Sequence, residues 1–306
     1  MVAPVVIARE RIAELRGTLD PEVSLPELWC SGTPAGLTRR CVAIVGTRAA
    51  TPLGRHIARR MAYELARAGC AILSGLALGI DAAAHEGALD ARGATLGILG
   101  GGHRRFFPRR NLPLAERMLA AGGAVLSPFA PDEPPRPGHF LARNGIVAAL
   151  ADALVVIEAP ARSGALNTAG WAAGRIPVLA VPGDVDRPQV QGCLALLRDG
   201  ATLARNADDV LEALGLAPAA ERLEAPSAER RPPAGSDGGV APAILAALDL
   251  GEQSLDDLVA AAHAPCSAVL AALALLELDG HACRRGAATW ARTLDPSNGA
   301  PSCTCV

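Results

Sequence analysis

Short apolar segments alternate with amphipathic segments between residues 42 and 215. The apolar segments do not place a polar residue at every second position, which is typical of strands in a parallel sheet covered on both faces. After the first of them, Ile57, Met61 and Leu65 recur at helical spacing, and the arginines lie outside that stripe. The alternation predicts a doubly wound α/β sheet with right-handed crossovers. Six strands are expected, at residues 42–46, 71–74, 95–100, 124–127, 153–158 and 178–181.

The pattern changes after residue 215. Proline, glycine, alanine and charged residues follow without periodicity, which predicts a linker. Three helical patterns and a short hairpin turning at Gly286 then match the outline of a winged helix. The helices are expected at 241–249, 254–263 and 266–279. The expected divisions are an N-terminal extension (1–36), a sheet domain (37–215), a linker (216–240), a winged-helix-like domain (241–292) and a flexible tail (293–306).

Composition and charge narrow the classes of function. Half of the 306 residues are apolar and a fifth are charged, so two domains with buried cores are feasible. The net charge is -2, so a polyanion would have to bind at a local basic patch. All 29 basic residues are arginine, and the absence of lysine excludes a Walker A phosphate loop, a pyridoxal Schiff base and a lysine nucleophile.

Metal sites, cofactors and membrane insertion are not expected. The eight cysteines form no C-x-x-C pair, and the six histidines show neither H-E-x-x-H nor zinc-site spacing. Arg9, Glu10 and Arg11 interrupt the first apolar stretch, so we expect no signal peptide. No segment is long and apolar enough to span a bilayer. A reduced, cytoplasmic environment is therefore the expectation.

Ligands of open parallel sheets bind outside the carboxyl ends of the strands, so the loops that follow the strands are the candidate site. The first loop is Gly46-Thr47-Arg48. Thr51 can cap the next helix and Pro52 suits its first position. The free N–H groups and dipole of that helix would favour an anion, and Arg48 adds a full charge. The alternative is an ordinary strand–helix turn.

The second loop, SGLALGIDAAAH, spans residues 74–85. Ser74 and Gly75 follow the strand directly, and a glycine there lets the backbone approach a ligand. Asp81 and His85 lie one helical turn apart and could form an acid–base pair. The alternative is a helix cap beside a surface histidine.

The third loop, GGGHRRFFPRRN, spans residues 100–111. Its three glycines could expose N–H groups as an anion-binding nest. Arg104 and Arg105 precede Phe106 and Phe107, and arginines interleaved with aromatic residues are typical of single-strand binding. A solvated charged face is the alternative.

The fourth loop, PPRPGHFLARNG, spans residues 134–145. If a helix starts near His139, then Phe140, Arg143 and Asn144 share one face. A ring, a guanidinium and an amide together can stack on an unpaired base and hydrogen-bond to it. Core packing of Phe140 is the alternative.

The fifth loop, IEAPARSGALNTAG, spans residues 157–170. Ser163 and Gly164 start a helix, where Ser163 could act only as a cap or could offer its hydroxyl to a phosphate. Together the five loops place glycines, arginines and aromatic residues along one edge of the sheet. This arrangement predicts a long anion-binding groove for an unpaired polynucleotide.

Five motifs in this order resemble the DNA-processing protein A (DprA/Smf) family: VAIVGTR, SGLALGIDAAAHEGAL, PPRPGHFLARN, EAPARSGALNTA and AVPGDV followed by GCLALLRDGA. The resemblance covers residues 28–215 and, more loosely, 241–292. It implies an extended Rossmann-like domain with helices on both faces, followed by a winged-helix module. By motif position it implies the strand-binding residues Gly46, Thr47, Arg48, Phe140, Arg143, Asn144, Ser163 and Gly164.

The family resemblance also implies a function. Its members bind single-stranded DNA during natural transformation, the competence pathway of DNA uptake and recombination, and they are dimers that load the RecA recombinase. No catalytic activity is established for the family, so we expect no enzyme and no cofactor. With Ser74, Gly75, Arg104 and Arg105 from the loops above, twelve residues are predicted to bind DNA.

The chain departs from the family pattern at three basic positions. Pro137 stands where many members carry a basic residue, although Arg136 could substitute for it. Gly145 and Leu78 replace arginines of the motifs R-N-R-I and G-L-A-R-G-I-D. These losses predict weaker DNA affinity.

Other functions fit the sequence less well. A Rossmann-like nucleotide-processing enzyme of the phosphoribohydrolase type would need converging carboxylates, for which Glu158 and Asp81 are the candidates. A dehydrogenase would need G-x-G-x-x-G after the first strand, and the chain lacks it. The C-terminal module is more acidic than basic, so we expect it to contact protein instead of duplex DNA.

Overall fold

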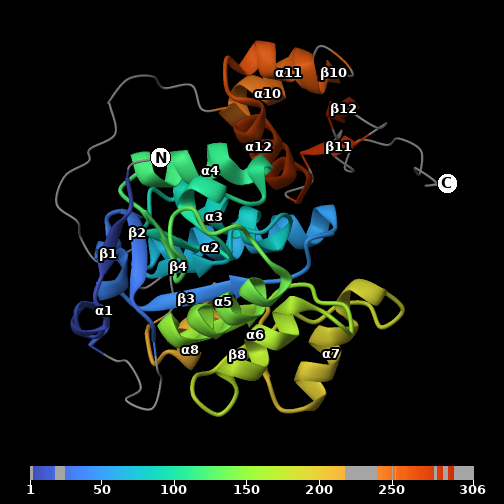
Figure 1. Cartoon of the computed structure of the whole chain (residues 1–306). Coiled ribbons are helices and arrows are strands. Elements are labelled where there is room, and N and C mark those ends of the chain that lie inside the picture. Colours follow the sequence, from blue (N-terminus) through green and yellow to red (C-terminus); the bar gives the residue numbers. More distant parts are fainter. Residues whose placement is uncertain are drawn as a thin grey trace. The chain divides into compact units, whose positions relative to one another are not determined.

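The computed structural model describes residues 3–17, 25–217, 240–249, 251, 253–278, 281–284 and 289–292. The chain forms two units, Met1–Ser227 and Ala228–Val306 (Figure 1). The predicted linker and tail lie largely outside the described residues, as does the hairpin turn at Gly286.

The first unit is built on a nine-stranded sheet with the order β1-β2-β6-β5-β4-β3-β7-β8-β9. Strands β3 to β9 are parallel, whereas β1 and β2 pair antiparallel at one edge. Strands β4, β5 and β6 follow one another on one side of β3, whereas β7, β8 and β9 follow one another on its other side. The strand order therefore reverses between β3 and β7. The crevice at such a switch point is where open α/β sheets bind ligands. The strands are β1 (Val5–Ile7), β2 (Leu28–Gly32), β3 (Cys41–Val45), β4 (Ala71–Ser74), β5 (Thr95–Ile98), β6 (Ala124–Ser127), β7 (Ala153–Val156), β8 (Val178–Ala180) and β9 (Thr202–Leu203).

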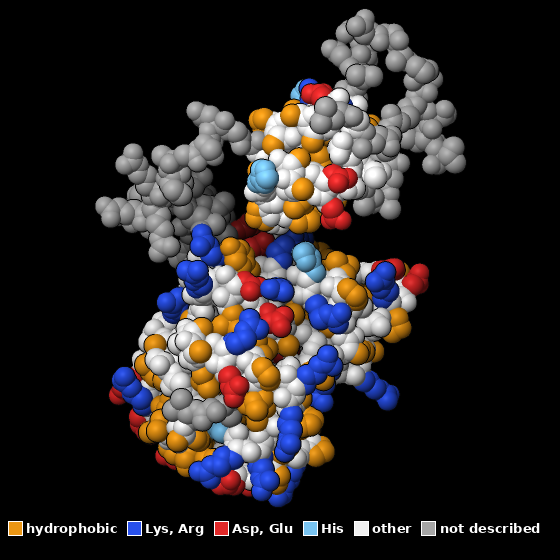
Figure 2. All heavy atoms as spheres, turned by 90° about the horizontal axis from the view of Figure 1, so that it is seen from above, with side chains coloured by type: hydrophobic (Ala, Val, Ile, Leu, Met, Phe, Trp, Pro, Cys, Tyr) orange, Lys and Arg blue, Asp and Glu red, His pale blue; other side chains and the backbone are white. Residues whose placement is uncertain are grey.

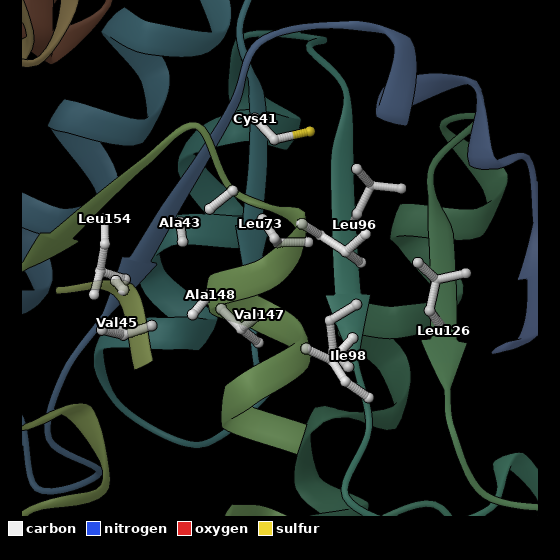
Figure 3. Packing of buried hydrophobic residues seen from close by; sticks show 14 of the residues in the cluster. Cys41, Ala43, Val45, Leu73, Leu96, Ile98, Leu126, Val147, Ala148 and Leu154 are labelled. Carbon is white, nitrogen blue, oxygen red and sulfur yellow. The ribbon is translucent and has the colours of Figure 1, made fainter. Parts of the chain in front are cut away.

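Helices cover both faces of this sheet, as the sequence predicts. Alternate residues of β3 point to opposite sides: Val42 and Ile44 pack with α2, α3 and α8, whereas Ala43 and Val45 pack with α5 and α6. Figure 3 shows Val147 and Ala148 of α5 lying against the apolar side chains of neighbouring strands. The helices are α1 (Arg9–Arg16), α2 (Pro52–Arg67), α3 (Ile80–Asp90), α4 (Leu112–Ala120), α5 (Pro137–Leu150), α6 (Gly164–Ala172), α7 (Gln191–Arg198) and α8 (Ala207–Ala213).

All six predicted strands are present, with ends that differ by at most two residues. The sequence did not predict β1, β2 or β9, which are short edge or near-edge strands. The N-terminal extension therefore contributes two strands to the sheet. A buried ion pair of 2.8 Å between Arg16 Nη2 and Asp152 Oδ2 ties it to the core, and the same carboxylate oxygen accepts the Cys41 N–H at 2.6 Å.

The second unit has the helix and strand order of a winged helix. A three-stranded antiparallel sheet, ordered β10-β12-β11, packs with three helices around a core that includes Ile244, Leu258, Leu273 and Trp290. Its elements are α10 (Val240–Leu248), β10 (Gln253–Ser254), α11 (Leu255–Ala262), α12 (Cys266–Leu278), β11 (Ala282–Arg284) and β12 (Thr289–Arg292). Across the described part of the chain, no single helix could cross a membrane by length and composition, and only α11 and α12, bent by 105°, pass that test as a pair.

Candidate nucleic-acid interface

A cavity of about 830 Å³ opens where the strand order reverses, at the carboxyl ends of β3 and β7. Eight of the twelve residues predicted to bind DNA line it. They come from the loop after β3, from α5 and from the loop before α6. The eight are Gly46, Thr47, Arg48, Phe140, Arg143, Asn144, Ser163 and Gly164.

The mouth of the cavity carries a cluster of one guanidinium and two rings. Arg48 is exposed, and its Cζ lies 5.3 Å from the centroid of the Phe140 ring. Phe107 meets Phe140 edge-on, with 6.0 Å between ring centroids, and is 48% exposed. Phe140 is half-buried, and a Cβ at Gly100 would lie 2.5 Å from its Cδ1. The ring therefore packs on the β5 loop and also faces the cavity, so both alternatives for Phe140 hold in part.

The N-terminus of α2 is not free to bind an anion. Thr51 caps the helix as predicted, its Oγ1 accepting the Gly54 N–H at 2.9 Å. The buried Glu158 carboxylate accepts the Thr51 N–H at 2.9 Å and the Thr51 hydroxyl at 2.5 Å. The prediction that free amides of this helix hold the ligand is therefore wrong, because the protein supplies its own carboxylate there. What the loop after β3 offers to a ligand is chiefly the side chain of Arg48.

Arg143 lines the cavity, but its side chain is almost entirely buried behind the lining. The residue is 5% exposed, its Nη1 donates to the Ile98 carbonyl at 3.3 Å, and it lies 4.0 Å from Asp81 Oδ2. Burial lowers the pKa of Arg143, and the charge of Asp81 opposes that shift. A Cβ at Gly75 would overlap Nη1, so the close approach that glycine permits serves Arg143 instead of a ligand.

Asn144 is also buried, although it lines the first cavity together with Phe140 and Arg143, as their shared helix face predicts. The Asn144 amide donates to the Gly164 carbonyl at 3.1 Å and to Asn167 Oδ1 at 3.2 Å. These bonds hold α5 against the start of α6. Asn144 therefore positions Gly164 at the cavity.

Ser74 and Gly75 do not line the cavity. Ser74 is fully buried, and its hydroxyl donates to the Ile44 carbonyl at 2.6 Å. The Gly75 N–H donates to Asp81 Oδ2 at 3.1 Å. Ser74 and Gly75 therefore have a structural role: they help to hold the turn after β4 and the space that Arg143 fills.

Neither sequence-based alternative for Asp81 and His85 is correct. The Asp81 carboxylate is buried and accepts the N–H groups of Gly75 and Ala77, which fixes the turn after β4. His85 is not on the surface: it is fully buried and its Nδ1 bonds Thr95 Oγ1 at 2.7 Å. Burial, with a smaller effect of the Arg143 charge, lowers the pKa of His85 to about 3. An imidazole held neutral in this way cannot exchange protons with a ligand near neutral pH.

The arginine-rich third loop forms a second cavity beside the first. The glycines at 100–102 are buried, and the Gly102 N–H donates to the Glu133 carbonyl at 2.8 Å, so the predicted nest is absent. Arg104 and Arg105 line a cavity of about 960 Å³. Phe107 and Pro135 line both cavities, which makes the two contiguous.

The start of α6 completes the first cavity. Ser163 Oγ accepts the Leu166 N–H at 3.3 Å, so this residue is the helix cap. Gly164 and Ala165 follow it in the lining, and the first N–H groups of a helix have no partner within the helix. This helix start, unlike that of α2, meets the cavity directly.

The first cavity is locally basic although the chain is weakly acidic. Four arginines line it, Arg48, Arg136, Arg143 and Arg162, together with the carboxylate of Asp81. Arg136 is the residue expected to substitute for the missing basic side chain at Pro137. On the face drawn in Figure 2, arginines are spread over the larger unit with fewer acidic groups between them. Within the described residues there is no group of three or more His, Cys, Asp or Glu that could hold a metal ion.

Sequence reasoning missed Arg162 and Leu141, which also line the cavity. Arg162 directly precedes Ser163 in the fifth loop, so its place in the sequence could have marked it. Leu141 is 53% exposed on α5, and its apolar side chain carried no signal for a nucleic-acid site.

Comparison with known proteins identifies this architecture. The sequence model of the family described as DNA recombination-mediator protein A matches residues 15–215. The chain belongs to this family. A second model, the DprA winged helix domain, matches residues 227–287. The DprA protein of Mycobacterium tuberculosis is 41% identical over 268 residues, which are 85% of this chain and 67% of that protein. DNA processing protein DprA of Bacillus subtilis is 38% identical over 57% of this chain and 59% of its own length.

Two solved structures of family members resemble this chain over about three fifths of its length. DNA processing protein A from Streptococcus pneumoniae aligns with a TM-score of 0.57 at 36% identity, over 61% of this chain and 65% of that one. DNA processing protein A from Helicobacter pylori, a protein with a single-stranded DNA binding mode, aligns with a TM-score of 0.56 at 29% identity, over 64% of this chain and 95% of that one. The predicted fold class and family are thus confirmed.

Proposed function

We propose that this chain binds single-stranded DNA in the first cavity and along the adjoining second cavity. The observation that carries the proposal is the placement of Arg48 over Phe140 at the mouth of a basic crevice. A guanidinium can bind phosphate while a ring stacks on a base, and this combination tolerates any base sequence. The single-strand binding of the relative from Helicobacter pylori supports the same role here.

The two cavities suit a chain of nucleotides better than one small molecule. Phe107 joins them, and basic side chains continue from Arg48 on one side to Arg105 on the other. A strand lying across both would meet arginines and ring faces in succession. Such a site is the positively charged groove with stacking platforms that unpaired nucleic acid requires.

We further propose a role in natural transformation and recombination, in which the bound strand is protected and the RecA recombinase is loaded onto it. We base this role, a homodimeric state and a cytoplasmic location on the family resemblance, and the description of the family as a recombination mediator supports the recombination part of the role. A direct test is whether the purified protein accelerates RecA filament formation on a single strand that is already covered by a single-strand-binding protein.

A nucleotide-processing enzyme of the phosphoribohydrolase type is the alternative, and the two carboxylates do not favour it. The Glu158 carboxylate accepts hydrogen bonds from the N–H and hydroxyl of Thr51, and Glu158 is not part of the cavity lining. Asp81 accepts two backbone N–H groups and lies beside Arg143, in the wall of the cavity. Both carboxylates have structural partners, so neither is positioned as a free general base.

A salt titration of binding tests the proposal. The protein should bind an oligodeoxythymidine more tightly than a duplex of equal length. The logarithm of the binding constant should fall linearly with log salt, by about 0.7 for each phosphate contacted on a single strand. Equal affinity for the single strand and the duplex, or an affinity that does not change with salt concentration, would contradict the proposed site.

A further inference from the structure

Trp171, in the last turn of α6, is 51% exposed. A Cβ built on Gly145 of α5 would lie 3.5 Å from both Cδ2 and Cε2 of the indole, the two atoms that its rings share. Contact at the centre of the ring system means that one flat face of the indole, and not an edge, rests on α5. The opposite face is therefore the part of Trp171 that solvent reaches. A large ring held flat in this way is a ready surface for stacking.

The indole of Trp171 adjoins the first cavity. Helices α5 and α6 pack side by side (Figure 1). On α5, Leu141 lines the cavity, is exposed and lies one helical turn before Gly145. On α6, Thr168 lines the cavity and lies three residues before Trp171. On both helices the ring is thus one turn beyond the cavity lining, and Leu141 lies between the two.

Trp171 lies on the side of the site that is opposite to the second cavity. The arginine-rich third loop, which forms the second cavity, follows β5 on one side of β3, whereas α6 follows β7 on the other side. A DNA strand that runs from the second cavity through the first would therefore continue over Leu141 to the indole. Along this path the strand would meet the rings of Phe107, Phe140 and Trp171 in that order.

The charge around Trp171 suits an anionic ligand. Neither α5 nor α6 contains an acidic residue. The chain between residues 137 and 180 has two, Asp152 and Glu158, and both carboxylates are buried in ion pairs or hydrogen bonds of their own. Arg175 is exposed just after α6, and its Nη1 donates to the Trp171 carbonyl at 3.2 Å. A ring with a cation near it and no carboxylate on its own helices fits a base and its phosphate. Leu141 and Trp171 alone are too small a patch for a stable protein partner.

We propose that the exposed face of Trp171 stacks on a base of the DNA strand where the strand leaves the first cavity over Leu141. This inference rests on the proposed function, to which it adds one end of the binding path and a further ring. About 10 Å separates Gly164, at the cavity, from Trp171 along the axis of α6. A DNA strand that only fills the cavity therefore does not reach the indole, whereas a longer one does. Because every base has a π-face, the contact adds affinity without sequence preference.

Binding of oligodeoxythymidines of increasing length by the full-length protein tests the inference. Wild type should gain affinity as the strand grows, and Trp171→Leu, which keeps an apolar side chain against Gly145, should lose the gain that comes when the strand passes the cavity. For the longer strands this loss should be about 5- to 150-fold, the contribution of one stacked base. For the shortest strands that bind, the two proteins should have equal affinity, which shows that the variant is folded and its cavity intact. Trp171→Phe should keep most of the long-strand affinity, because it keeps a ring that can stack.

Tyr63→Leu is the matched control, since Tyr63 is an exposed ring (41%) on α2, which covers the opposite face of the sheet. It should leave the affinity for strands of every length unchanged. Tryptophan fluorescence gives a second measurement: long strands should quench a component of the emission that short strands leave unchanged and that Trp171→Leu lacks. An unchanged long-strand affinity in Trp171→Leu, or an equal loss for short and long strands, would overturn this inference and leave the proposed function standing. Failure of wild type to bind strands of any length would overturn both.

Discussion

The guanidinium of Arg48 lies over the ring of Phe140, with Cζ 5.3 Å from the ring centroid. The first residue follows β3 and the second is in α5, so the fold brings a cation and an aromatic face together at the strand-order reversal. The same cation can contact a phosphate while the ring contacts the adjacent base. Removing the Arg48 side chain and removing the Phe140 ring should therefore change DNA binding in different ways.

Arg48→Ala should weaken single-strand binding and flatten its salt dependence. If the side chain neutralises one phosphate, the slope of log affinity against log salt should change by about 0.7. Arg48→Lys should restore most of the slope but less of the affinity, because an ammonium lacks the planar fork that stacks on a ring. Arg67→Ala, at the other end of α2, is the matched control and should change neither quantity. An unaltered slope for Arg48→Ala would remove this loop from the site.

Phe140→Ala should reduce the free energy of single-strand binding by about 1–3 kcal/mol, the usual contribution of one base stacked on an aromatic ring. The ring also packs on Gly100, so a moderate fall in melting temperature is expected as well. Phe140→Tyr separates the two effects, since it keeps the ring and should keep the binding. Loss of thermal stability with intact binding would make Phe140 a core residue only.

The same substitution at two helical glycines should have opposite effects on stability. At Gly145 in α5 an added Cβ meets the Trp171 ring at an ordinary 3.5 Å, so Gly145→Ala should stabilise the fold by about 0.4–1 kcal/mol by restricting the unfolded chain. At Gly54 in α2 an added Cβ would lie 2.3 Å from Glu158 Cδ. Gly54→Ala should displace the carboxylate from Thr51 and cost about 1–3 kcal/mol. Urea unfolding of the two variants measures the change in the free energy of unfolding at each position. An increase in stability for Gly54→Ala would refute the role of Glu158 at the α2 cap.

The buried His85 should make the protein less stable as the pH falls. The unfolded chain binds a proton at His85 near the ordinary pKa of 6.5, whereas the folded protein resists this protonation until about pH 3. Between these values, the free energy of unfolding should therefore drop by about 1.4 kcal/mol per pH unit from this residue alone. His85→Asn, which can keep the hydrogen bond to Thr95 Oγ1, should reduce the slope by that amount. Identical slopes for variant and wild type in urea titrations would show that His85 is accessible to protons when folded.

Much of the architecture was predictable because burial on both faces leaves a periodicity in the sequence. The segments of β3, β4, β5, β6, β7 and β8 are apolar without alternation, and the helices between them carry one apolar stripe each. The edge strands β1 and β9 were not predictable in this way. They have three and two residues, respectively, and their exposed side chains, such as Val5, Val6 and Leu203, give no pattern that separates a strand from a loop.

The identity of the loops at the site was predictable, but the state of each side chain in them was not. The rule that loops after parallel strands meet at one edge placed Arg48, Phe140 and Ser163 together, and all three line the first cavity. The sequence also suggested Arg143 as a residue that contacts the DNA strand, whereas Asp81 and the Ile98 carbonyl hold its guanidinium in the buried wall of the cavity. The type of a residue does not reveal whether a partner distant in sequence already forms the hydrogen bonds or ion pair that its side chain needs.

The sequence by itself determined the alternation of the six inner strands with helices and the residues of the loops that follow these strands, since these depend on local periodicity and on the general geometry of parallel sheets. Only the tertiary structure decided which polar groups remain free for a ligand. Glu158 occupies the start of α2 and Asp81 engages Arg143, because a buried charge requires a partner and the packed chain supplies one from the nearest element. Arg48 stays exposed over Phe140 because no carboxylate in the described cavity lining reaches it.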